Sequence, residues 1–79
     1  MGWQDYIERN PDVMLGKPVF KGTRLTVELV LEKLGGSVTE DELLRSYPQL
    51  RPEHVRAAQA FAAASLSSDE MIFLRESSR

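Results

Sequence analysis

The chain has 79 residues, of which 42% are hydrophobic and 28% are charged, with a formal net charge of −2 and no cysteine. A single domain of this size buries only about 60% of the surface of its unfolded chain, so we expect a marginal stability that a partner would raise. The composition excludes disulfide bridges and thiolate metal sites, and the net charge argues against strong, unspecific binding of nucleic acid.

The amino-terminal residues carry neither the basic start nor the apolar stretch of a secretory signal. No apolar run approaches the roughly 20 residues that a membrane span requires. We therefore expect a cytoplasmic protein that contacts no membrane and uses no cofactor.

The first predicted element is a short β element near the amino terminus. Residues 10–12, Asn-Pro-Asp, are a turn signal, which makes residues 7–9 a candidate strand. Val19 and Phe20 can pair back onto that strand. A two-stranded piece of this kind needs helices or a second subunit packed against it.

The most informative stretch is residues 16–27, with the sequence GKPVFKGTRLTV. It holds two glycines, a proline and three cations without a single acid. Glycine permits positive φ or a close backbone approach, and Pro18 fixes φ while withholding a donor, which favours an edge strand. We therefore predict that a shaped backbone presents these cations.

The three cations Lys17, Lys21 and Arg24 have two interpretations. They can grip phosphates or reach into a minor groove, as basic arms do beside some DNA-binding helices. For Lys17 and Lys21 we expect exposure, with or without DNA. For Arg24 we favour a structural role, in which it is partly buried and bound to backbone carbonyls or to an acid such as Glu28.

The first helix is predicted to begin after Thr26, which can cap it. Its apolar residues recur every three or four positions and so form one stripe, consisting of Val27, Val30, Leu31 and Leu34. Gly35 and Gly36 end this helix.

The second helix has the strongest local signal in the chain. Residues 39–42, Thr-Glu-Asp-Glu, form a capping box, and Val38 and Leu43 are placed for a hydrophobic staple. The acids suit the positive end of the helix dipole, and Pro48 ends the helix after about two turns.

The third helix is predicted to start at Pro52, because proline is favoured at the first helical position and Leu50 and Val55 can form a second staple. We expect it to run to Ala64 or Leu66, with a polar break over residues 65–68 and a short final helix. The chain is then divided into residues 1–66, the β element with the helical domain, and residues 67–79, a docking segment.

The second and third helices have the lengths of a helix-turn-helix, whose second helix enters the major groove by its amino-terminal end. Arg51, His54 and Arg56 lie at that end, where arginine can fork onto guanine or bind phosphate. The alternative is that these side chains are merely solvated, because any three-helix core contains such a helix pair. We expect His54 to be a surface or capping residue rather than a catalytic base.

The apolar run Met71, Ile72, Phe73 and Leu74 precedes Arg75 near the carboxyl end. Such a run can anchor in a groove of a partner. It can equally fold back onto its own core or onto a twin subunit.

The pattern GKPVFKGTRLTV, with SYPQL at residues 46–50, resembles a family of small bacterial domains of unknown function, number four hundred and thirty-three. The resemblance covers residues 7–64. It implies a mainly α, dimeric unit with a three-helix, homeodomain-like helix-turn-helix core and a short N-terminal β element. Some members look like antitoxins paired with PIN-like toxins.

From the residues and this resemblance we expect an antitoxin-like homodimer that neutralises a PIN-like ribonuclease toxin. Binding of the homodimer to its operator DNA is a second expectation. The residues expected to bind the toxin are Met71, Ile72, Phe73, Leu74 and Arg75, and those expected to contact DNA are Lys17, Lys21, Arg24, Arg51, His54 and Arg56. The alternative is a non-enzymatic adaptor module that dimerises and binds another protein without DNA. A single histidine, without cysteine or a spaced acid–histidine set, predicts neither a metal site nor an enzyme.

Overall fold

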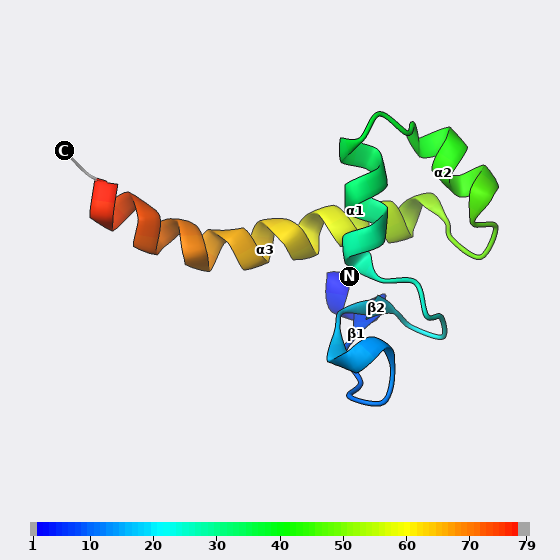
Figure 1. Ribbon diagram of the computed structural model, residues 1–79, viewed down its shortest axis with the longest axis horizontal. Helices are drawn as coiled ribbons and strands as arrows, with labels where there is room; N and C mark the ends of the chain where they lie inside the picture. The colour runs from blue at the N-terminus through cyan, green and yellow to red at the C-terminus, as the bar shows by residue number, and fades with distance from the viewer. Residues whose placement is uncertain (1, 78–79) are drawn as a thin grey trace.

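The computed structural model describes the backbone of residues 2–77 and the side chains of residues 2–67. Within this part the chain is mainly helical, with three α-helices and a small two-stranded antiparallel sheet near the amino terminus (Figure 1). The elements in chain order are η1 (Trp3–Asp5), β1 (Ile7–Glu8), η2 (Met14–Gly16), β2 (Val19–Phe20), α1 (Val27–Gly35), α2 (Glu40–Ser46) and α3 (Pro52–Ser77).

The predicted β element is confirmed. β1 and β2 pair antiparallel, with Ile7 opposite Phe20. The turn after β1 begins at Asn10, whose side-chain Oδ1 accepts a hydrogen bond of 2.9 Å from the Asp12 N–H. The local turn chemistry of asparagine therefore reverses the chain, as the sequence indicated.

The expected positive φ at the glycines of the basic stretch is also confirmed. Gly16 has φ 80° and Gly22 has φ 77°, a region that strains any residue with a side chain. Met14 and Leu15, immediately before Gly16, also have positive φ, 49° and 58°. Three successive left-handed residues thus close the turn that leads into β2.

Pro18 directly precedes an edge strand, as its missing N–H donor indicated, because β1 and β2 are the two strands of the sheet. β2 pairs with β1 on one side, and on the other side Val19 forms a bridge to Thr26. The Pro18 carbonyl accepts a hydrogen bond of 3.0 Å from the Val27 N–H, in the first turn of α1. The residues that follow β2 therefore fold back along it and lead into the first turn of α1.

The predicted caps of α1 and α2 are confirmed. The Thr26 Oγ1 accepts a hydrogen bond from the Leu29 N–H, 3.0 Å long. In α2 the Thr39 Oγ1 accepts from the Glu42 N–H at 3.1 Å, while the Glu42 Oε1 accepts from the Thr39 N–H at 2.9 Å. This reciprocal pair is the capping box that the sequence predicted.

α3 begins at Pro52 as predicted, but its predicted end is wrong. The helix is 26 residues long and continues through residues 65–68, where we expected a polar break, to Ser77. Serine is only slightly less favourable in a helix than alanine, and residues 53–77 contain neither glycine nor proline. Nothing in this stretch of sequence therefore interrupts the helix. The division at residue 66 stays a prediction.

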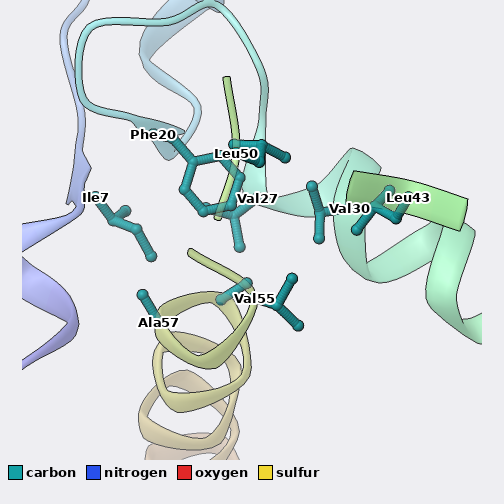
Figure 2. Packing of buried hydrophobic residues seen from close by; sticks show 9 residues of the cluster. Ile7, Phe20, Val27, Val30, Leu43, Leu50, Val55 and Ala57 are labelled. Carbon is teal, nitrogen blue, oxygen red and sulfur yellow. The ribbon is translucent and has the colours of Figure 1, made fainter. Parts of the chain in front are cut away.

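The hydrophobic core lies where the sheet, α1, α2 and the first turns of α3 meet (Figure 2). Phe20 and Leu43 are its largest fully buried side chains. Figure 2 shows the Phe20 ring between Ile7 of β1 and Val27 of α1. The buried hydrophobic residues are Ile7, Val19, Phe20, Val27, Val30, Leu43, Leu50, Val55, Ala57 and Ala58.

The second half of α3 projects away from this core (Figure 1). The molecule measures 46 × 30 × 25 Å, and its radius of gyration is 14.1 Å. A compact domain of this length would have a radius of about 11.6 Å. Among the described helices none is both long and apolar enough to cross a membrane.

The capping box makes the stability of the fold depend on pH. The pKa of the Glu42 carboxyl is held below its usual range. The largest cause is the hydrogen bond from the Thr39 N–H, followed by the bond from the Thr39 hydroxyl, and the charge of Arg45 adds a smaller effect. A carboxyl whose pKa is lower in the folded chain stabilises the fold above its unfolded pKa. That contribution is lost as the pH falls through the folded pKa, so the stabilisation by Glu42 is greatest at neutral pH.

We predict that Thr39→Ala raises the pKa of Glu42 in a carboxyl NMR titration. The stability that this substitution removes, measured by urea unfolding, should shrink as the pH is lowered through the usual range of a glutamate. Thr26→Ala is the matched control, because it removes the cap of α1 without a carboxyl partner and should cost about 1 kcal/mol in the same pH range. A Glu42 that titrates at its usual pKa in the unmodified chain would contradict the prediction.

Candidate functional site

The amino-terminal end of α3 is built around His54. Its Nδ1 accepts a hydrogen bond of 2.9 Å from the Arg51 N–H, so the expected capping role of this histidine is confirmed. The half-buried ring also lies edge-on to Tyr6 and to Phe20, with ring centroids 5.4 Å apart in each case. His54 thus joins the start of α3 to β2 and to the residue that precedes β1.

This aromatic junction brings the basic stretch to the start of α3. Lys21 follows Phe20, and its N–H donates a hydrogen bond of 2.9 Å to the Tyr6 carbonyl. Arg51 stands on the other side of the junction, and both cations are exposed. We name the surface around Lys21, Arg51 and His54 the basic corner. The basic corner contains one cation from each of the two segments predicted to contact DNA, Lys21 from the basic stretch and Arg51 from the start of α3.

Arg56, the third residue proposed at the start of α3, is held by an acid of α2. Its Nη1 lies 3.1 Å from Oε1 of Glu40 and its Nη2 lies 3.4 Å from Oε2, a two-pronged contact. The Nη1 also donates to Oε1 of Gln59 at 3.4 Å. Because the Arg56 side chain is 61% exposed, we expect this pair to stabilise the fold by no more than about 1 kcal/mol. An anion can therefore compete for Arg56 at small cost.

The favoured interpretation of Arg24 is wrong. Arg24 is exposed, and the acid Glu28 is paired instead with Lys17, at 3.3 Å between Nζ and Oε1. The turn does not need the guanidinium, because the Thr23 hydroxyl donates to the Phe20 carbonyl at 2.8 Å and accepts from the Leu25 N–H at 3.0 Å. The role of Thr23 was not predicted, although threonine commonly makes such local hydrogen bonds in turns.

The charge around the basic corner is mixed rather than uniformly positive. Glu53 is exposed on the first turn of α3, and the acids of the α2 capping region lie close enough for Glu40 to reach Arg56. Among residues 2–67 the ion pairs are Lys17–Glu28 and Arg56–Glu40. No group of histidine and acid side chains in that range is arranged to hold a metal ion.

A second surface is an apolar groove between α1 and α3, which we name the α1/α3 groove. Its volume is about 490 Å³. Val27 and Leu31 line it from α1, and Phe61, Ala62 and Leu66 line it from α3. Volumes of this order are typical of ligand and peptide pockets.

The proposed toxin-binding residues cannot be placed as side chains. Met71, Ile72, Phe73, Leu74 and Arg75 lie outside the residues whose side chains the structure describes, although their backbone belongs to α3. Their role stays a prediction.

Comparison with known proteins gives one family. The model of a family described as "Protein of unknown function (DUF433)" matches residues 7–62. A protein of Sinorhizobium fredii (strain NBRC 101917 / NGR234), described as "Uncharacterized protein y4eO", is 29% identical over 62 residues. The match covers 78% of this chain and 28% of that relative, so the chain spans little more than a quarter of its length. No solved structure matches the chain.

Proposed function

The chain belongs to the family described as protein of unknown function DUF433, and we propose that it is an antitoxin-like homodimer. In this proposal it binds a PIN-like ribonuclease toxin in the cytoplasm and neutralises it. The mechanism is occlusion of the nuclease by a bound helix, without chemistry on the part of this chain.

The single observation that carries the proposal is the length of α3 beyond the core. Phe61 and Ala62 are the last described residues of α3 that are half-buried, and residues 63–67 are exposed. The backbone from residue 63 to residue 77 extends the helix by about 22 Å. An isolated helix of this length is marginal in water and gains most of its stability from packing. A projecting helix of this kind therefore favours a protein that works by binding another one.

The sequence of the projecting part suits a nuclease as the partner. Its apolar run, Met71 to Leu74, supplies anchors of the kind that dominate protein interfaces, and Arg75 follows directly. A ribonuclease that works through metal ions holds them with acidic residues. An arginine delivered beside apolar anchors can pair with those acids and exclude the RNA substrate.

DNA binding is the second part of the proposal. We assign α2, the turn and α3 as a homeodomain-like helix-turn-helix, with the start of α3 as the part that enters the major groove. The basic corner supports this assignment, because Lys21 and Arg51 are exposed beside the positive end of the α3 dipole. Arg24 is exposed as well, and Arg56 becomes free if a phosphate displaces Glu40.

The alternative function is an adaptor module that dimerises and binds another protein without DNA. Two observations favour it. Lys17 and Arg56, two of the six proposed DNA contacts, are already paired with acids of the same chain. The formal net charge of −2 also gives duplex DNA no long-range attraction to the molecule as a whole.

We predict that Phe73→Asp weakens binding of the chain to a purified PIN-like ribonuclease toxin, measured by calorimetry. A charge would replace an apolar anchor in a desolvated contact, which weakens binding by at least about a hundredfold. Glu76→Gln, a polar change in the same segment, is the control and should leave the affinity unchanged. If Phe73→Asp still binds the toxin with unchanged affinity, residues 71–75 are not the toxin-binding segment.

For DNA we predict that affinity for the duplex upstream of the gene falls steeply as the salt concentration rises. Lys21→Gln and Arg51→Gln should each reduce the slope of log affinity against log salt by about 1. Arg9→Gln is the matched control, because the Arg9 Cζ lies 6.0 Å from the Phe61 ring centroid, away from the start of α3. Glu40→Gln, which releases Arg56, should strengthen binding.

Binding curves that are the same for Lys21→Gln, Arg51→Gln and Arg9→Gln would contradict the assignment of the basic corner. Complete absence of duplex binding at low salt would favour the adaptor module. Neither result bears on capture of the PIN-like protein, so the two parts of the proposal can be judged separately.

A further inference from the structure

The α1/α3 groove is an apolar surface that the described residues leave open. Its α3 side ends in Leu66, which is 61% exposed, a large fraction for a leucine beside a core. Its α1 side carries the exposed acids Glu28 and Glu32, which also line the groove. The groove thus combines an apolar floor with a negative edge, and a helix with an apolar face and a nearby cation fits that combination.

The chain cannot fill its own groove with the apolar run near its carboxyl end. Met71 follows Leu66 by five residues in the same continuous helix, and therefore lies about 7.5 Å further along the helix axis. A segment could fold back only through a break in α3. No glycine or proline follows Pro52, and the helix shows no break up to Ser77.

We propose that the α1/α3 groove receives residues 71–75 of a second copy of this chain. The apolar run Met71 to Leu74 would cover the floor formed by Leu31, Phe61 and Leu66. Arg75 would then lie at the α1 edge, where Glu32 supplies the opposite charge and where Arg75 can share Glu28 with its partner Lys17. The acids Asp69 and Glu70 precede the apolar run, so this pairing fixes the direction of the segment, with its arginine end toward Glu28 and Glu32.

The exchange is reciprocal. Each copy has one groove and one projecting helix, so a two-fold axis satisfies both at once and closes the assembly as a dimer. Residues 71–75 already belong to α3 in the single chain, so docking costs less ordering entropy than it would for a disordered tail.

This inference rests on the proposed function in one respect, the use of the same segment for the toxin. A toxin that captures residues 71–75 would empty the groove of the twin. Self-association through this contact and toxin capture therefore exclude each other, so the homodimer would give up this contact when it binds its toxin. The free homodimer would keep its apolar run covered until a toxin competes for it.

The test uses the fact that the natural chain has no cysteine. We would prepare the full chain with Glu32→Cys or with Arg75→Cys, mix the two variants and oxidise them mildly. We expect a disulfide-linked dimer in the mixture and its loss when either variant is oxidised alone. Glu53→Cys, exposed at the far end of α3, is the control and should not cross-link to Arg75→Cys.

Sedimentation of Leu66→Asp provides an independent measurement. Because Leu66 is mostly exposed, the substitution should leave the helical circular dichroism unchanged while self-association weakens by about tenfold or more. A natural chain that remains monomeric at every concentration would overturn the inference. So would a dimer that Leu66→Asp leaves intact, or one in which Arg75→Cys cross-links to itself, since the two projecting helices would then pair with each other.

These outcomes can be separated from a failure of the proposed function. Leu66→Asp keeps residues 71–75 and should still capture the PIN-like protein. If the chain captures the toxin but no cross-link forms in the mixed sample, only the reciprocal docking is contradicted. If the cross-link forms but the chain does not capture the toxin, only the antitoxin role is contradicted.

Discussion

The packing of Phe20 against the first turn of α3 is the contact on which the rest of the molecule depends. Phe20 is fully buried, its ring meets His54 edge-on at 5.4 Å, and it shares the core with Leu50 and Val55. Burying a phenylalanine contributes about 1.5–3 kcal/mol, a large share for a domain of marginal stability. Because Phe20 stands in the middle of the basic stretch, its burial also decides where Lys21 is presented.

The two ends of α3 serve different purposes in this arrangement. The first end is fixed, by the cap that His54 gives Arg51 and by the pair between Arg56 and Glu40 of α2. The other end projects beyond the last half-buried residues and has no described core contact. Because α3 is continuous from its anchored end, the chain can offer a binding segment that is already helical.

The sequence predicted the features that neighbouring residues decide. The caps at Thr26 and Thr39, the start of α3 at Pro52 and the positive φ at Gly16 and Gly22 depend on a few adjacent residues, and all are confirmed. Ion pairs were not predictable, because Lys17 and Glu28 are 11 residues apart and Arg56 and Glu40 are 16 apart. Which charged residues pair depends on how the helices pack in the folded chain. The predicted end of α3 is wrong because serine is not a strong helix breaker, whereas glycine and proline are.

Amide hydrogen exchange measures whether the sheet and α3 open together. We expect the Lys21 amide, which is bonded to the Tyr6 carbonyl, to have the same free energy of opening as the Ala58 amide in the buried part of α3. In His54→Ala both values should fall by the same amount. A Lys21 amide that exchanges much faster than the Ala58 amide in the natural chain would show that the basic stretch is not held by α3.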